Sequence, residues 1–98
     1  MVIVIKDIVA SCDTTTQGMQ VLDHLRKALL DQDDVTLDFT GVPNVTSSFV
    51  NSALLPLLGQ YDLYTVQNRL KIVAANRQIG NMIRIRMSAE SALKHNAA

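Results

Sequence analysis

The stretch Val35–Leu58, VTLDFTGVPNVTSSFVNSALLPLL, decides the fold because it combines a buried strand, a polar turn and an apolar helix. In Val35–Phe39, apolar and polar residues alternate, as in a strand with one buried face. Gly41 and Pro43 follow, and both residue types are typical of turns. The next apolar residues recur at helical spacing: Val50, Ala53, Leu54, Leu57, Leu58 and Tyr61. The stretch therefore predicts a strand, a turn and a helix in succession.

Pro56 lies inside this expected helix. Proline lacks a backbone N–H, and its ring clashes with the carbonyl one turn earlier, here that of Ser52, at a cost of about 3 kcal/mol in a regular helix. Gly59 weakens the end of the helix further. The sequence therefore predicts a kinked helix or a helix in two pieces.

Two strands and two helices are expected around this unit. The β-branched run Val2–Val9 predicts a strand. A polar connection, Ser11–Gly18, contains helix-capping residues and leads into a helix that ends near Gln32. One face of that helix carries Val21, Leu22, Leu25, Ala28 and Leu29. Arg69–Ala75 predicts the third strand, and Asn76–Lys94 predicts a helix, although the alternating MIRIRM inside it also fits a short strand.

The order is thus β-α-β-α-β-α. It predicts an α/β fold with a small mixed or mostly parallel β-sheet and helices packed over it. A chain of 98 residues with 48% hydrophobic residues has the size of one domain, so we expect a single domain over residues 1–98. With no Trp and few aromatic residues, its core must be aliphatic.

The formal net charge is zero, which argues against nucleic acid or a membrane surface as the partner. Residues 31–62 carry five acids and no base, whereas residues 69–98 carry six bases and one acid. We interpret this as two solvated surfaces that differ, rather than as a contact face. No apolar run reaches the length of a membrane span, and the apolar start lacks a signal-peptide pattern. Cys12 has no partner for an internal disulfide. We expect a cytoplasmic protein.

Motifs for catalysis and cofactor binding are absent from the sequence. The glycines are too far apart for a phosphate-binding loop, and no GxGxxG follows a strand. His24 and His95 lie on separate segments, and Cys12 has no neighbouring zinc ligand. We therefore expect no catalytic residue, no metal and no cofactor, and a protein that is not an enzyme.

The turn after the second strand holds three consecutive hydroxyls, Thr46, Ser47 and Ser48. Loops at the carboxyl ends of strands often carry the functional groups of α/β proteins. Thr46 or Ser47 is also a good N-cap, since a hydroxyl oxygen accepts a hydrogen bond from a free backbone N–H. From residue types alone, capping is the favoured role.

Val35–Tyr61 resembles the central motif of STAS domains, the fold of bacterial anti-sigma factor antagonists. The segment Leu37–Thr40 is similar to the end of the motif's strand, and Ser47 and Ser48 are similar to its serine pair. The variant LDFTGV…TSSF resembles more closely the STAS-like domains that are often encoded beside, or fused to, a histidine-kinase-like (GHKL-type) ATPase. The later RLKIVAANRQIGNMI also suits such domains. Thr46 and Phe49 stand where the motif has an acid and a glycine.

The resemblance implies a non-enzymatic regulatory module that docks a GHKL-type ATPase, a serine kinase or a related regulator. In antagonist families the second serine is phosphorylated, which implies Ser48 as the candidate phosphorylation site and Ser47 as the second candidate. The implied partner-binding residues are Thr40, Gly41, Asn44, Thr46, Ser47, Ser48, Phe49 and Ser52. A core position for Phe49 is the favoured alternative to an exposed contact.

Two other functions stay open at this point. One is a constitutive scaffold or homo-oligomerisation module without a phosphorylation switch. The other is a domain that binds a small ligand or nucleotide through the same turn.

Overall fold

The computed structural model describes residues 1–32 and 34–96. Three parallel strands form one sheet in the order β1-β2-β3: β1 (Val2–Val4), β2 (Val35–Asp38) and β3 (Leu70–Val73). Ile3, Leu37 and Ile72 lie side by side across the three strands. The predicted α/β class is confirmed, and the sheet is parallel throughout the described residues.

The two faces of the sheet differ in burial. Ile3, Val35 and Leu37 are buried on the face that the helices cover. The opposite face carries residues that are exposed or only half-buried: Val2, Val4, Thr36, Asp38, Lys71 and Val73. The alternation read from Val35–Phe39 is therefore the alternation between a helix-covered face and an open one.

The helix α2 (Thr15–Asp31) packs on the sheet through its predicted apolar stripe, and all of these residues are buried. Thr14 is its N-cap, and Gln17 completes a capping box. At the other end, the Arg69 Nη2 atom donates to the carbonyl oxygens of Leu29 at 2.6 Å and Gln32 at 2.8 Å. Both ends of α2 are thus held by side chains.

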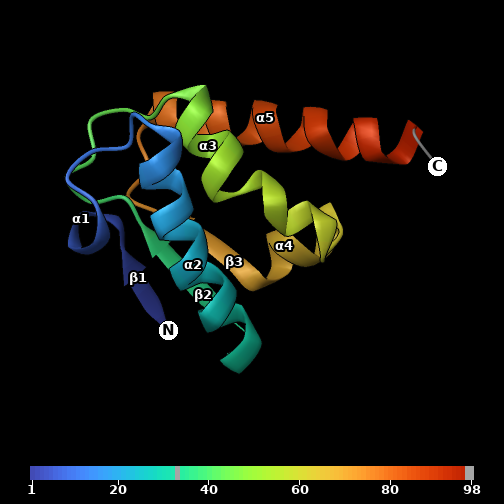
Figure 1. The fold of residues 1–98 in the computed structure, drawn as a ribbon, viewed down its shortest axis with the longest axis horizontal. Helices are drawn as coiled ribbons and strands as arrows, with labels where there is room; N and C mark the ends of the chain where they lie inside the picture. The colour runs from blue at the N-terminus through green and yellow to red at the C-terminus, as the bar shows by residue number, and fades with distance from the viewer. Residues whose placement is uncertain (33, 97–98) are drawn as a thin grey trace.

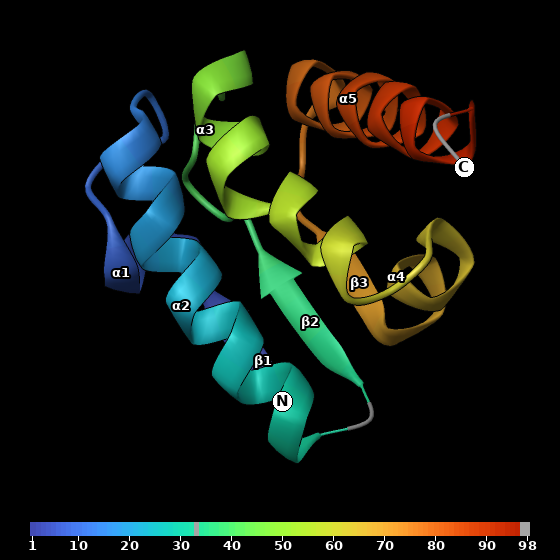
Figure 2. The same ribbon diagram turned by 45° about the vertical axis from the view of Figure 1, so that its right-hand side comes forward.

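Next to α2 lies α3 (Ser47–Ala53), and both ribbon views show the two helices side by side (Figures 1 and 2). The closest approach is at Gly18. A Cβ atom built there would lie 1.8 Å from Ser52 Oγ and 2.6 Å from the carbonyl oxygen of Phe49. Position 18 therefore requires a glycine, because the backbone of α3 occupies the space that a side chain would need.

The predicted break at Pro56 is confirmed. After α3, the chain continues as the 3₁₀ helix η1 (Leu55–Gly59), in which Pro56 occupies the first turn, where a missing N–H costs no hydrogen bond. A further short helix, α4 (Leu63–Arg69), leads directly into β3 and was not predicted. Its N-cap is Asp62, whose Oδ1 accepts from the Thr65 N–H at 2.7 Å.

At the N-terminus, the strand prediction for Val2–Val9 is wrong beyond Val4. Instead of continuing, the chain makes one helical turn, α1 (Ile5–Ile8), which buries Ile5 completely. Tertiary burial here overrides the preference of β-branched residues for strands.

At the other end of the chain, α5 (Arg77–Asn96) is a single helix, so the alternative of a strand at MIRIRM is wrong. It buries Ile79 and Met87, whereas Ile85 is 55% exposed. Figure 1 shows the C-terminal half of α5 extending beyond the rest of the fold. Among the described residues, no helix combines the length and apolarity that crossing a membrane requires.

Candidate functional site

The candidate site is the loop that joins β2 to α3. It starts at the carboxyl end of the central strand and turns sharply at Gly41, whose φ of 79° is in the left-handed region that glycine adopts without strain. The Val42 N–H donates to the carbonyl oxygen of Phe39 at 3.0 Å, which closes this turn. The side chains of Val42 and Val45 are buried, so the loop is held to the core between its exposed residues.

A carboxylate fixes the start of the loop. Asp38 Oδ1 accepts two hydrogen bonds from Thr40, one from its hydroxyl at 2.6 Å and one from its backbone N–H at 2.8 Å. Both hydrogen bonds stabilise the charged carboxylate and therefore lower the pKa of Asp38 below its ordinary value of 3.8. The hydroxyl contributes more to this shift than the N–H does. The residues LDFT of the sequence motif thus form a local Asp–Thr turn.

When the titration of the Asp38 carboxyl group is monitored by NMR, we expect its midpoint at a pH below 3.8, the ordinary pKa of an aspartate. Since the folded-state pKa is lowered, the stabilisation from Asp38 is complete above 3.8 and is lost as the pH falls through the folded-state pKa. Thr40→Val should move the midpoint upward, because it removes the hydroxyl that contributes most to the shift. The control is Thr40→Ser, which keeps a hydroxyl. An unchanged midpoint in Thr40→Val would contradict this assignment.

Thr46 fixes the end of the loop. Its hydroxyl oxygen accepts from the Phe49 N–H at 3.1 Å, so Thr46 is the N-cap of α3, and the same hydroxyl donates to the carbonyl oxygen of Asp13 at 2.8 Å. Its backbone N–H donates to the carbonyl oxygen of Cys12 at 3.1 Å. Of the two N-cap candidates in the sequence, Thr46 takes the role and Ser47 does not.

Thr46→Ala should lower the free energy of unfolding by about 1–2 kcal/mol, as is typical for the loss of an N-cap side chain. It removes both hydroxyl contacts and keeps the backbone contact to Cys12. Thr46→Ser is the matched control, because serine can make the same two hydrogen bonds. Urea denaturation of the three proteins measures the difference, and equal stability of Thr46→Ala and Thr46→Ser would contradict the capping role.

Two amide side chains near the start of α5 hold the middle of the loop. Gln78 accepts from the Val45 N–H at 3.0 Å and donates to the Val45 carbonyl oxygen at 2.9 Å. Asn76 donates to the carbonyl oxygen of Pro43 at 2.8 Å, while its Oδ1 accepts from the Ile79 N–H at 2.9 Å. Sequence reasoning missed both residues. The only available signal was the spacing from Asn76 to Ile79, which is that of an N-cap.

The serine pair lies on the surface that this loop presents. Ser47 and Ser48 are both exposed, and neither hydroxyl has a hydrogen-bond partner among the residues described. Thr40, Gly41 and Asn44 are exposed as well, and Thr46 is half-buried. These residues, which the resemblance implied as a partner-binding set, therefore lie on one short, accessible segment.

Phe49 and Ser52 need a correction, because their side chains do not reach that surface. Phe49 is 1% exposed and lies in the core. Ser52 is 9% exposed, and its Oγ donates to the carbonyl oxygens of Ser48 at 2.9 Å and Phe49 at 3.1 Å. Ser52 follows Ser48 by one turn, but it faces Gly18 of α2, so the crossing of the two helices covers it.

A comparison with known protein families identifies the family to which the chain belongs. The family described as STAS-like domain of unknown function (DUF4325) matches residues 17–79, which is more than half of the chain. The chain belongs to this family. The resemblance read from the sequence is thereby confirmed, and the whole loop with Ser47 and Ser48 lies inside the matched range. Searches of curated proteins and of solved structures found no match.

Other reactive groups of the STAS-like domain are not exposed on this loop surface. Cys12 is 1% exposed, and burial is the main cause that raises the pKa of its thiol to about 11, so the thiolate needed for reaction is scarce near neutral pH. His24 is exposed on α2, with Nδ1 2.9 Å from the carbonyl oxygen of Gln20. In the part of the chain that the structure describes, no group of three His, Cys, Asp or Glu side chains could hold a metal ion.

Proposed function

We propose that this STAS-like domain is a non-enzymatic regulatory module that docks a bacterial GHKL-type ATPase or serine kinase through the loop after β2. The surface consists of Thr40, Gly41, Asn44, Ser47 and Ser48, which we call the docking loop. Membership of the STAS-like family supports a regulatory or interaction module as the general class. The observation that carries the proposal is that two exposed serine hydroxyls stand on a backbone held at both ends and in the middle.

The hydrogen bonds around the loop favour binding because they reduce the ordering that a partner must impose. A loop that is already fixed loses little conformational entropy on association. Asp38 fixes its start, Gln78 its middle and Thr46 its end, and these three residues lie outside the docking loop as defined above. The hydroxyls of Ser47 and Ser48 make none of these contacts and are free to contact a partner.

We further propose Ser48 as the phosphorylated residue and Ser47 as the second candidate. A phosphate adds a charge of about −1.5 to −2 and, on an exposed side chain, does not bury that charge in the domain. The Ser48 carbonyl oxygen accepts from Ser52 Oγ, so the position of the residue is set from inside the fold. The added charge would weaken docking to an acidic or apolar partner surface and leave the fold intact.

The test is to incubate the purified domain with the GHKL-type ATPase encoded nearest to it, with MgATP, and to measure the intact mass. We expect one added phosphoryl group in wild type and in Ser47→Ala, and none in Ser48→Ala. Calorimetry should show that Ser48→Asp binds the ATPase at least about tenfold more weakly than Ser48→Ala. Ser47→Asp is the matched control, with the same charge one residue earlier.

Each result has a distinct meaning. The absence of both a phosphate and a complex would contradict the docking proposal. If Ser48→Ala and Ser48→Asp bind like wild type, the domain is a constitutive scaffold and the switch is wrong. A nucleotide or phosphate that binds the domain alone at the docking loop, with no ATPase present, would instead indicate a ligand-binding domain.

A further inference from the structure

The outer edge of β3 has backbone groups that the sheet does not use. In a parallel pair, alternate residues of a strand direct both their N–H and C=O to the same neighbour. The Phe39 N–H donates to the carbonyl oxygen of Val73 at 3.0 Å, so Val73 and Lys71 are the residues that bond to β2. The N–H and C=O of Ile72 therefore point outward, and they have no backbone partner in the described part of the chain.

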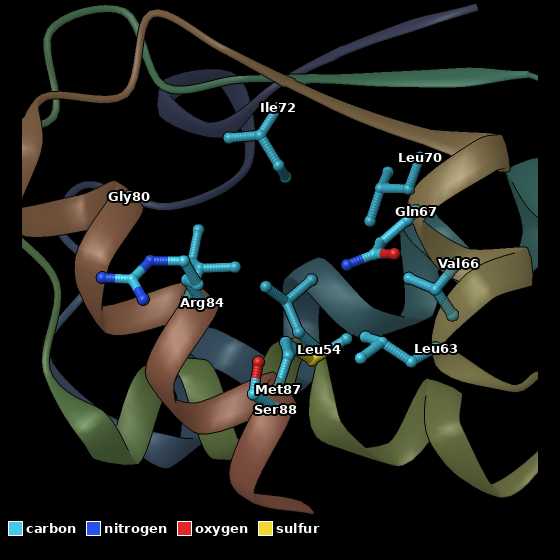
Figure 3. Close-up of a pocket in the computed structure, with 11 residues that line it drawn as sticks. Leu54, Leu63, Val66, Gln67, Leu70, Ile72, Gly80, Arg84, Met87 and Ser88 are labelled. Carbon is cyan, nitrogen blue, oxygen red and sulfur yellow. The ribbon is translucent and has the colours of Figure 1, made fainter. Parts of the chain in front are cut away.

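An apolar pocket of about 230 Å³ opens beside this edge, on the helix-covered side of the sheet. Its apolar lining residues come from α4, β3 and α5 and from the residue that follows α3: Leu54, Leu63, Val66, Leu70, Ile72, Ile83 and Met87. Figure 3 shows β3 along one side, α4 on a second side and α5 on a third. The volume is below the roughly 300–1,000 Å³ of sites for drug-sized ligands. It suits one or two aliphatic side chains better than a cofactor.

The polar groups around the pocket are cationic or neutral. Arg84 and Gln67 belong to the lining, and the Gln67 amide points into the space between the apolar side chains (Figure 3). Lys71 is exposed on the open face of the sheet, next to Ile72 in the edge strand. Among the residues that the structure describes, no Asp or Glu lines the pocket. This charge distribution favours a ligand with carboxylates close to its apolar groups.

We propose that the β3 edge and the adjacent pocket bind an extended segment of a partner protein as a fourth strand of the sheet. Backbone hydrogen bonds to Ile72 would supply the part of the affinity that does not depend on the sequence of the segment, and the pocket would supply specificity. Since successive side chains of a strand point to opposite faces, an aliphatic residue would enter the pocket while its acidic neighbours lie beside Lys71. The recognised pattern is thus acidic and aliphatic residues in alternation.

A second copy of the chain fits this edge less well than such a segment. Antiparallel pairing of two β3 edges about Ile72 would bring the Lys71 and Arg84 side chains of both copies into one interface, where like charges repel. Pairing of β3 with the β1 edge of another copy would be head-to-tail, which generates open-ended chains of molecules. The partner segment avoids both problems.

The proposal does not depend on Ser48 or the docking loop, and its test uses a different probe. We would titrate the ¹⁵N,¹³C-labelled domain with a short peptide of alternating glutamate and leucine. We expect chemical-shift changes at the Ile72 amide and at the methyl groups of Leu63 and Val66. A peptide of the same composition, with glutamates and leucines in separate blocks, should produce no saturable change at these positions.

Two variants locate the site without disturbing the core. A Cβ at Gly80 has no atom within 4 Å, so Gly80→Leu should fill the pocket and also favour the helix. Gly80→Leu should lower the affinity for the alternating peptide by at least about tenfold, the effect of excluding one aliphatic side chain. Gly80→Ala should change this affinity little. Lys71→Glu should also lower the affinity for this peptide, and it should raise the affinity for a peptide in which lysine replaces glutamate.

Three results would overturn the proposal. The first is the absence of shifts at Ile72 with millimolar peptide. The second is undiminished binding by Gly80→Leu, which would place the peptide elsewhere. The third is a concentration-dependent dimer that protects the Ile72 amide and excludes the peptide, because a second copy would then be the occupant.

Discussion

Gly18→Ala is expected to lower the free energy of unfolding by about 2–4 kcal/mol, a large part of the stability of a small domain. In an exposed helix the same change would stabilise, since alanine is the better helix former by about 1 kcal/mol. At Gly18 the new Cβ would lie 2.6 Å from the carbonyl oxygen of Phe49, a backbone atom that cannot rotate away. Separation of α2 from α3 is then the only relief, and it opens the core.

The measurement is urea denaturation followed by circular dichroism, with Gly80→Ala as the matched control. Nothing lies within 4 Å of a Cβ at Gly80, so that variant should gain about 0.5–1 kcal/mol. Ser52→Ala in the Gly18→Ala background should recover only part of the loss, because it removes the Oγ contact and leaves the backbone contact. Equal stability of Gly18→Ala and wild type would show that the two helices do not approach as closely as described.

Phe49→Ala is expected to cost about 3–5 kcal/mol, the range for truncating a buried phenylalanine. Phe49 is 1% exposed and follows directly after the serine pair, at the position where the related motif has a glycine. In this member of the family the position contributes to the core instead of leaving the surface open. Phe49→Gly, which restores the glycine of the motif, should therefore destabilise at least as much as Phe49→Ala.

The control for Phe49 is Ser47→Ala in the same helix. Ser47 is exposed and does not cap the helix, so this change should stay within about 0.5 kcal/mol of wild type. Thermal unfolding of the three variants gives the comparison. A small effect of Phe49→Ala, combined with loss of binding to the ATPase, would instead assign Phe49 to the partner surface.

The helices and strands in which apolar residues recur at regular spacing were predictable from the sequence. The stripe from Val21 to Leu29 and the alternation in Val35–Phe39 reflect burial on one face, and the structure has both. The short helices were not predictable, because a single turn at Ile5–Ile8 contains too few residues to establish a period. The helix α4 had a capping signal at Asp62, but its seven residues are mostly polar and bury only Val66.

In the site, local chemistry was predictable and long-range contacts were not. The sequence indicated Thr46 as one of two N-cap candidates, because capping involves residues within one turn. The contacts from Thr46 to Asp13 and from Gln78 to Val45 each join residues 33 positions apart. No local pattern encodes such distances. Ser52 was misplaced for the same reason, because the helix that covers it lies elsewhere in the sequence.

The parallel arrangement of the sheet has a consequence for folding kinetics. Each strand pairing joins distant parts of the chain, as in Val2 with Thr36 and Val35 with Leu70, and a whole helical segment must be placed before either ladder can close. No hairpin is available in the described sheet as an early local nucleus. High sequence separation of contacts slows folding. The helices should therefore form first, with sheet closure as the slow step, and the crossing at Gly18 should be made before that closure.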